Sequence, residues 1–137
     1  MIVGIGIDSV AVERFKTWNS YSFEKLRRIF SAYEIEYCRA NPLLSAQRFA
    51  VRFAAREALF KAISQALPTH SIPFLTLCRA TTITTIAKAP EIKIEAELLS
   101  SYRVPSDYWD PYTMNMLCSL SHTDSLATGL VILEKTP

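Results

Sequence analysis

Two acidic side chains and a lysine have the types and the spacing that metal-assisted phosphate chemistry requires. Asp8 follows a short β-branched segment that contains Gly4 and Gly6. Glu57 and Lys61 are four residues apart in an alanine-rich stretch, so on a helix they are neighbours. Mg²⁺ prefers a few carboxylates together with water and substrate phosphates. These residues therefore suggest a site in which a cation holds a phosphate and the lysine neutralises a leaving phosphate.

Each of these residues also has an ordinary structural explanation. Asp8 can be a helix cap or a turn residue. Glu57 and Lys61 can form an exposed ion pair along one helix, which contributes little to stability. Taken one at a time, the residues leave both explanations open.

A second group of basic and polar residues is suited to binding an anion. Arg48, Arg52 and Arg56 are four residues apart and line one face of the same predicted helix, where they repel one another unless they face anions. Residues 119–123, with the sequence SLSHT, place hydroxyls and the His122 imidazole at a strand end, where they can contact a phosphate. A lone histidine is also common as a structural residue. No GxSxG pattern surrounds the serines, so a hydrolase nucleophile is not supported.

The elements that position these residues form an α+β pattern. Residues 2–7 predict a first strand whose two glycines share one face, as expected where something approaches the backbone closely. Residues 45–67 predict the longest helix. Further strands are predicted at residues 81–86, 91–95, 114–120 and 126–133, the last two joined by a turn at Thr123-Asp124. This order favours one domain over residues 1–137, with helices packed on an antiparallel sheet.

Shorter helices are expected between the first strand and the long helix. Asp8-Ser9 ends the strand, and Ser31 with Glu34 forms a capping box that begins a helix closed by Asn41-Pro42. Apolar spacing predicts two helices before it, one through Val12, Phe15 and Trp18 and one through Phe23, Leu26, Ile29 and Phe30. Residues 101–113 are predicted to be a surface loop.

Composition excludes several classes of protein. A net charge of +2 over 137 residues does not indicate nucleic-acid or membrane binding. The N-terminal residues lack a basic segment and no apolar run is long enough to span a membrane, so we expect neither a signal peptide nor a membrane anchor. The three cysteines are odd in number and widely separated, which indicates structural thiols in a reducing cytoplasm.

The order of the motifs resembles the holo-acyl-carrier-protein synthase family of phosphopantetheinyl transferases. Residues 4–8 (GIGID), with Val12, Arg14 and Phe15 after them, are similar to the family's opening motif. Residues 52–58 (RFAAREA), with Lys61-Ala62 behind them, are similar to its second motif, and residues 119–123 with Ala127 are similar to its closing motif. The resemblance extends over residues 2–66 and 114–134. It implies a 4'-phosphopantetheinyl transferase fold and an enzyme that moves phosphopantetheine from coenzyme A to a serine of an apo acyl carrier protein, releasing adenosine 3',5'-bisphosphate.

The resemblance also implies a role for each matching residue. Asp8 and Glu57 hold Mg²⁺, which contacts the coenzyme A diphosphate, and Lys61 stabilises or protonates the departing nucleotide. Glu57, or a water bound to the metal, is the candidate base that accepts the serine proton. The nucleotide end of coenzyme A, the co-substrate, is contacted by Arg48, Arg52, His122 and Thr123.

The remaining implications concern partners. The acidic carrier protein is expected to dock on Arg14, Phe23, Leu26, Arg27 and Arg28. The family resemblance further implies a homotrimer with active sites between subunits, working in the cytoplasm. Whether the carrier protein serves fatty acid or polyketide synthesis stays open. The chain departs from the family's pattern at Arg56, where a lysine is usual, and at Lys88-Ala89-Pro90, which replaces a Gly-Lys-Pro turn.

Two other classes of function remain as alternatives. A non-catalytic module that binds coenzyme A or a carrier protein would have little need for both Asp8 and Glu57. A nucleic-acid binder using the arginine row is disfavoured by the near-neutral charge and by the lack of a recognised motif.

Overall fold

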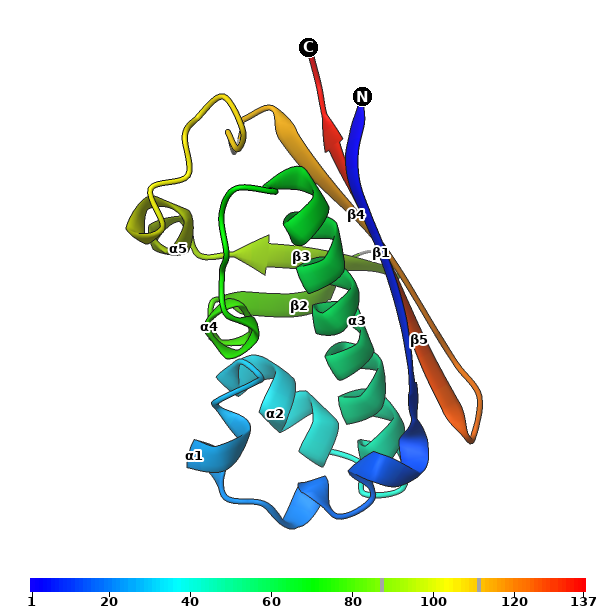
Figure 1. The fold of residues 1–137 in the computed structure, drawn as a ribbon. Coiled ribbons are helices and arrows are strands. Elements are labelled where there is room, and N and C mark those ends of the chain that lie inside the picture. The colour runs from blue at the N-terminus through cyan, green and yellow to red at the C-terminus, as the bar shows by residue number, and fades with distance from the viewer. Residues whose placement is uncertain (87, 111) are drawn as a thin grey trace.

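A single long helix, α3 (Ser45–Ala66), is the element around which the rest of the chain is arranged (Figure 1). The fold comes from a computed structural model that describes residues 1–86, 88–110 and 112–137. The predicted helix at residues 45–67 is confirmed to within one residue, because the alanine-rich sequence favours a helix and Pro68 follows its C-cap. No helix in the described ranges has both the length and the apolar character needed to cross a membrane.

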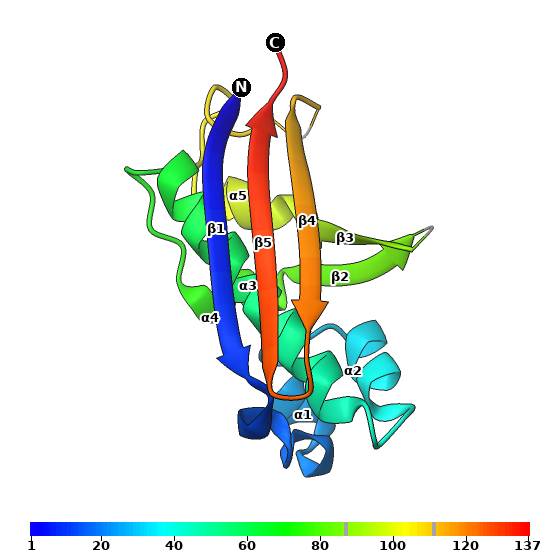
Figure 2. The same cartoon turned by 90° about the vertical axis from the view of Figure 1, so that its right-hand side faces the viewer.

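Helices packed on antiparallel sheets confirm the predicted fold class. The main sheet has the order β1-β5-β4, formed by Ile2–Ala11, Leu126–Lys135 and Met114–His122 (Figure 2). Helix α3 covers one face of it. A separate antiparallel hairpin, β2 (Thr81–Ile86) with β3 (Ala89–Ile94), lies beside the β4 edge.

The glycines of the main sheet allow α3 to approach it at backbone distance. Gly4 and Gly6 lie on the helix-facing side of β1, where an added Cβ would overlap the carbonyl oxygens of Ala62 and Ala58. Gly129 of β5 faces α3 in the same way. The expected close approach to the backbone is therefore present, and the approaching group is the helix backbone.

Strand β1 is longer than the sequence predicts. Its pairing with β5 continues from Ile2 to Ala11, so Asp8 and Ser9 lie inside the strand and do not end it. The prediction was wrong because aspartate and serine suggest a turn, whereas here the β5 partner supplies backbone hydrogen bonds through this segment.

The opposite face of the main sheet has no element packed on it among the described residues, and apolar side chains occupy its middle. Ile5, Ile132 and Leu117 form one row across the three strands, and Ile7 and Leu130 form the next. Ile5, Ile7 and Leu117 are exposed. A sheet face of this composition is suited to packing against another surface.

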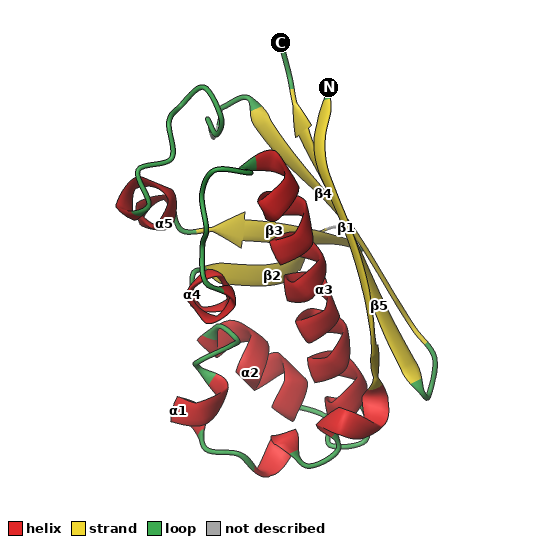
Figure 3. Ribbon diagram, in the orientation of Figure 1, coloured by secondary structure: helices red, strands yellow, loops and turns green. Residues whose placement is uncertain are grey.

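The remaining helices are short and gather at two places (Figure 3). Helices α1 (Phe23–Leu26) and α2 (Ala32–Arg39) cover the N-terminal half of α3, and the predicted capping box of Ser31 and Glu34 is confirmed. The two expected early helices are reduced to the 3₁₀ turns Val12–Phe15 and Trp18–Ser20 and to the single turn α1. Helices α4 (Phe74–Arg79) and α5 (Ala96–Ser101) were not predicted. Of the predicted 101–113 loop, Ser101 is the last residue of α5, the other described residues have no helix or strand, and Pro111 lies outside the described residues.

A buried ion pair fixes α2 against α3. Arg56 donates to both carboxylate oxygens of Glu34, at 2.8 and 2.6 Å, and both side chains are fully buried. Arg56 also donates to the carbonyl oxygen of Thr81, at the start of β2. The pair is bidentate and hydrogen-bonded to backbone, which is the geometry that compensates the cost of burying charge.

Candidate active site

Asp8 and Lys61 meet between β1 and α3. Lys61 Nζ lies 2.9 Å from Asp8 Oδ1 and donates a second hydrogen bond of 2.9 Å to the Ile7 carbonyl oxygen. Asp8 comes two residues after Gly6, so it lies on the helix-facing side of the strand, and its side chain is 14% exposed. The fold therefore brings these two predicted site residues together from distant parts of the sequence.

Glu57 lies on the same flank of α3, one turn before Lys61. Burial raises the pKa of the Glu57 carboxyl above its ordinary value of 4.5, and the Asp8 carboxylate raises it further, while Lys61 and Arg14 act in the opposite direction. Lys61 pairs with Asp8, and the ion pairs of the described residues include none with Glu57. The ordinary Glu57–Lys61 helix pair is therefore not what the structure shows. We call Asp8, Glu57 and Lys61 the carboxylate flank of α3.

Asp8 Oδ2 offers a ligand position for a cation. This oxygen is buried and has no hydrogen-bond partner in the described part of the chain, which is costly for a carboxylate. The Glu57 carboxylate is near enough for the Asp8 charge to raise the pKa of Glu57. Together the two residues provide two carboxylates, a set of ligands that Mg²⁺ prefers. The described residues contain no convergent group of three or more His, Cys, Asp or Glu side chains. The protein residues therefore fit a cation that takes its other ligands from water and phosphate.

A separate basic cavity opens where α2, α3, β4 and the β2–β3 hairpin meet. Its volume is about 340 Å³. The lining includes the predicted Arg48, Arg52 and His122, and also Tyr37 and Lys88. We call it the arginine cavity; the other lining residues are Leu44, Gln47, Val51, Thr85, Pro90 and Leu120.

The three arginines of the predicted row have different roles. Arg56 forms a buried ion pair with Glu34 and is not among the residues that line the cavity. Arg52 is 7% exposed, and its Nε has no hydrogen-bond partner among the described residues. Glu34 Oε1 lies 3.9 Å from that Nε, which is too long for a hydrogen bond. The Arg52 Nε is therefore a buried, unpaired donor on the side of Glu34, while the Arg52 side chain as a whole lines the cavity.

The closing motif divides between the cavity and a turn. His122 ends β4 and lines the arginine cavity. Thr123 lies in the hairpin turn, where its Oγ1 accepts hydrogen bonds of 3.3 and 3.1 Å from the backbone N–H groups of Ser125 and Leu126. The predicted turn at Thr123-Asp124 is thus confirmed, and the Thr123 hydroxyl shapes it.

The carboxylate flank and the arginine cavity lie on opposite sides of α3. Arg52 and Glu57 are five residues apart, which is about 140° around a helix. Asp8 belongs to β1 and His122 to β4, the two edges of the main sheet, with β5 between them (Figure 2). One chain therefore does not bring all the predicted site residues into one cleft.

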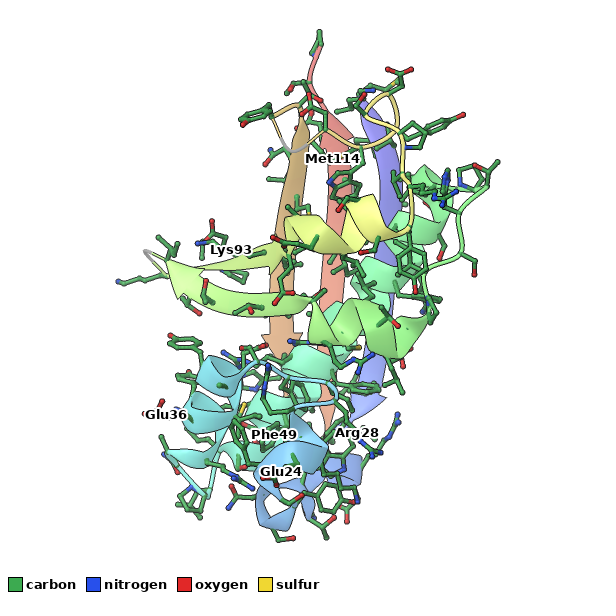
Figure 4. The ribbon with its side chains drawn as sticks, turned by 90° about the vertical axis from the view of Figure 1, so that its left-hand side faces the viewer. Glu24, Arg28, Glu36, Phe49, Lys93 and Met114 are labelled. Carbon is green, nitrogen blue, oxygen red and sulfur yellow. The ribbon has the colours of Figure 1, made fainter. Side chains whose placement is uncertain are left out.

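The predicted docking residues surround the α1 end of the molecule, with one exception. Arg14 and Arg28 are exposed, Phe23 is 45% exposed, and Figure 4 shows Arg28 and Glu24 at this end. Arg27 is half-buried and donates to the Phe30 carbonyl oxygen. Leu26 is 1% exposed because the short helix turns it into the core, so it offers almost no surface and its contact with a partner stays a prediction.

Two lining residues of the arginine cavity were missed in the sequence. Tyr37 has no motif around it, and only the one-turn spacing from Glu34 places it on the side of α2 that faces α3. Lys88 has a positive φ of 72°, a conformation that favours glycine. Because Lys88 stands where the Gly-Lys-Pro turn has its glycine, the sequence could have indicated this backbone conformation.

Comparisons with known proteins identify the family of the chain. The family described as the 4'-phosphopantetheinyl transferase superfamily matches residues 4–115. A holo-[acyl-carrier-protein] synthase of Geobacter sulfurreducens is 31% identical over 140 residues, covering 98% of this chain and 99% of the relative. One of Zymomonas mobilis is 33% identical over 141 residues, covering 100% and 99%.

Solved structures show the same fold. The holo-[acyl-carrier-protein] synthase of Neisseria meningitidis matches with a TM-score of 0.73 and 25% identity, over 98% of this chain and 100% of that one. The enzyme of Bacillus anthracis, solved in complex with CoA (3',5'-ADP), matches with a TM-score of 0.72 and 22% identity, over 99% of each chain.

The chain therefore belongs to the 4'-phosphopantetheinyl transferase superfamily and is an enzyme of that class. Within this class, the relatives that it matches over nearly its whole length are holo-[acyl-carrier-protein] synthases.

Proposed function

We propose that this enzyme transfers 4'-phosphopantetheine from coenzyme A to a serine hydroxyl of an apo acyl carrier protein. The serine oxygen forms a bond to the phosphorus that bears pantetheine, the phosphoanhydride bond breaks, and adenosine 3',5'-bisphosphate leaves. The observation that supports this most directly is the carboxylate flank. There Lys61 pairs with Asp8 Oδ1, Asp8 Oδ2 is left without a partner among the described residues, and the Asp8 charge acts on the nearby Glu57 carboxyl.

Asp8 and Glu57 are the proposed holders of Mg²⁺. When bound, the cation would neutralise charge on the diphosphate, which is the main requirement of phosphoryl transfer. Glu57, one turn before Lys61 on α3 and close to Asp8, is the proposed acceptor of the serine proton. Lys61 stands beside Asp8 and stabilises the oxygen of the departing nucleotide.

The arginine cavity is the proposed site for the nucleotide end of coenzyme A. Arg48, Arg52, His122 and Lys88 line it, and guanidinium groups bind phosphate with good geometry. The Thr123 hydroxyl already accepts hydrogen bonds from the backbone of the turn before β5. Thr123 is therefore proposed to support coenzyme A binding by shaping that turn.

The acidic carrier protein is proposed to dock on Arg14, Arg27, Arg28 and Phe23. Arg14 links this surface to the chemistry, because it is close enough to Glu57 to lower the pKa of that carboxyl. Its guanidinium lies 4.8 Å from the centre of the Phe53 ring, which holds it at the edge of the carboxylate flank. Docking by these charges is expected to weaken with salt.

A homotrimer with active sites between subunits is the proposed assembly. Within one chain, α3 separates the carboxylate flank from the arginine cavity, so a coenzyme A molecule that uses both needs the cavity of a second chain. The open apolar face with Ile5, Ile7 and Leu117 provides a surface for that chain. A cytoplasmic location and a role in fatty acid synthesis complete the proposal.

A transfer assay tests the proposal. The protein is incubated with apo acyl carrier protein, coenzyme A and Mg²⁺, and the carrier is weighed by mass spectrometry. A gain of one phosphopantetheine group that requires Mg²⁺ is expected. No gain with a verified apo carrier would overturn the proposal and leave a binding role.

Glu57→Gln is expected to reduce kcat by at least about a hundredfold, because it removes both the proposed base and a cation ligand. Glu36→Gln is the matched control, because it makes the same change at an exposed residue of α2. Figure 4 shows Glu36 and Arg28 on opposite sides of the end of the molecule that contains α1 and α2. Near-normal transfer by Glu57→Gln would remove Glu57 from the mechanism.

A further inference from the structure

Tyr37 of α2 lies between two arginines of the arginine cavity. The Cζ atoms of Arg48 and Arg52 are 4.1 and 4.5 Å from the centre of its ring. Arg48 Nη1 also donates a hydrogen bond of 2.8 Å to the Tyr37 carbonyl oxygen. Tyr37 is 40% exposed and is one of the residues that line the cavity. One residue therefore contacts both cations through its ring and one of them through its backbone.

The two arginines need such support because they repel each other. They are one turn apart on α3, and Arg52 Nη1 donates only a long bond of 3.3 Å to the Arg48 carbonyl oxygen. Glu34 is the nearest carboxylate to Arg52, at 3.9 Å, and its oxygens are already bound by Arg56. An aromatic face attracts a guanidinium and gives it a fixed plane.

Tyr37 is itself held in place by its helix. Glu34 lies one turn earlier in α2 and is tied to Arg56 by two short hydrogen bonds, so α2 cannot slide along α3 without breaking a buried pair. The helix thus fixes the position from which the Tyr37 ring contacts the two arginines. Holding them before the ligand arrives lowers the entropy lost on binding.

We propose that Tyr37 is a positioning residue, whose ring fixes the guanidinium groups of Arg48 and Arg52 for a phosphate at the nucleotide end of coenzyme A. The inference rests on the proposed function of the arginine cavity. The ring face is what matters, because both arginines lie over the ring. Tyr37 acts on nucleotide binding and does not take part in the bond-making step.

Binding of adenosine 3',5'-bisphosphate, measured by calorimetry on the intact protein, tests the inference. Tyr37→Leu is expected to weaken Kd about tenfold, the loss of two cation–π contacts. Tyr37→Phe keeps the ring face and is expected to stay within about twofold of the original Kd. Tyr33→Leu is the matched control, because Tyr33 lies on the same helix and is 54% exposed. In the transfer assay, Tyr37→Leu should raise KM for coenzyme A and leave kcat within about twofold.

A double-mutant cycle separates positioning from a general structural effect. If Tyr37 acts through Arg48, then Tyr37→Leu should weaken binding less in an Arg48→Gln background than in the original chain. Additive effects, an unchanged Kd in Tyr37→Leu, or a loss in Tyr37→Phe equal to that in Tyr37→Leu would overturn the inference. If Tyr37→Leu fails to fold, Tyr37→Gln replaces it under the same criteria. Failure of the original protein to bind the bisphosphate would instead overturn the proposed nucleotide site.

Discussion

The carboxylate flank shows how one charged residue can prepare a site for another. Lys61 takes one oxygen of Asp8 and leaves the other buried and without a partner among the described residues. An ion pair that satisfied both oxygens would close the site to a cation. The acidic and basic types in this group were predictable from the motifs. The division of Asp8 between its two partners was not, because it depends on the register of β1 against α3.

Lys88 combines an unfavourable backbone conformation with a place in the arginine cavity. A non-glycine residue in the left-handed region costs on the order of 1 kcal/mol. Lys88→Gly should therefore be more stable to urea than Lys88→Ala, by about 0.5–1 kcal/mol, since both remove the charge and only glycine relieves the backbone.

Both Lys88 variants should also bind adenosine 3',5'-bisphosphate more weakly than the original protein, and to the same extent, because each removes a cation from the cavity. Equal stability of the two variants would show that the positive φ costs nothing. Unchanged affinity would show that the Lys88 side chain does not reach the ligand.

At the scale of elements, long patterns were predictable and short ones were not. The 22-residue helix and the capping box follow from local sequence. Helices α4 and α5 have six residues each, too few for a periodic pattern, and they are stabilised by what they pack against. The extension of β1 through Asp8 depends on pairing with a strand more than a hundred residues away. The sequence therefore indicated which face of the long helix carries Glu57 and Lys61, whereas the burial of Leu26 on the single turn α1 could not be foreseen.

Gly6→Ala is expected to destabilise the fold by about 2 kcal/mol or more, because the new Cβ overlaps the Ala58 carbonyl oxygen and α3 must move. Urea unfolding measures the loss. Ser9→Ala is the matched control on the exposed side of the same strand, where the change removes only a hydroxyl contact with Thr128. A loss in Gly6→Ala no larger than in Ser9→Ala would contradict the close packing.

At the scale of the whole molecule, the arrangement of the two groups around α3 makes a direct prediction about assembly. Glu57→Gln damages the carboxylate flank, and Arg48→Glu damages the arginine cavity. If each site joins the flank of one chain to the cavity of the next, refolding the two variants together should restore about a quarter of the sites. The transfer assay measures the recovery.

Mixing Glu57→Gln with Asp8→Asn provides the control, because both changes damage the same flank and no mixed pair is intact. Recovery in the control, or none in the test mixture, would contradict active sites shared between subunits. Sedimentation of Leu117→Glu adds a physical measurement, since a charge on the open sheet face should dissociate the assembly.

The buried thiols predict how stability depends on alkaline pH. Burial raises the pKa of Cys38 and of Cys78 from 9.0 to about 12, although nearby arginines oppose the shift. The folded chain therefore holds these protons more tightly than the unfolded chain, so their contribution to stability is complete below pH 9 and falls as the pH rises toward 12. In urea unfolding, Cys78→Ala should lose less stability between pH 8 and pH 10 than the original protein, and an equal loss would contradict the assignment.

Helix α3 has a consequence for mixed populations of chains. In a closed ring of the proposed kind, every α3 serves two different active sites, and every site draws on two copies of α3. A chain with a damaged carboxylate flank or a damaged arginine cavity inactivates one site of the ring into which it is incorporated. A chain in which both groups are damaged inactivates two sites. The number of active sites that one variant chain inactivates among intact chains therefore depends on whether the change affects one side of α3 or both sides.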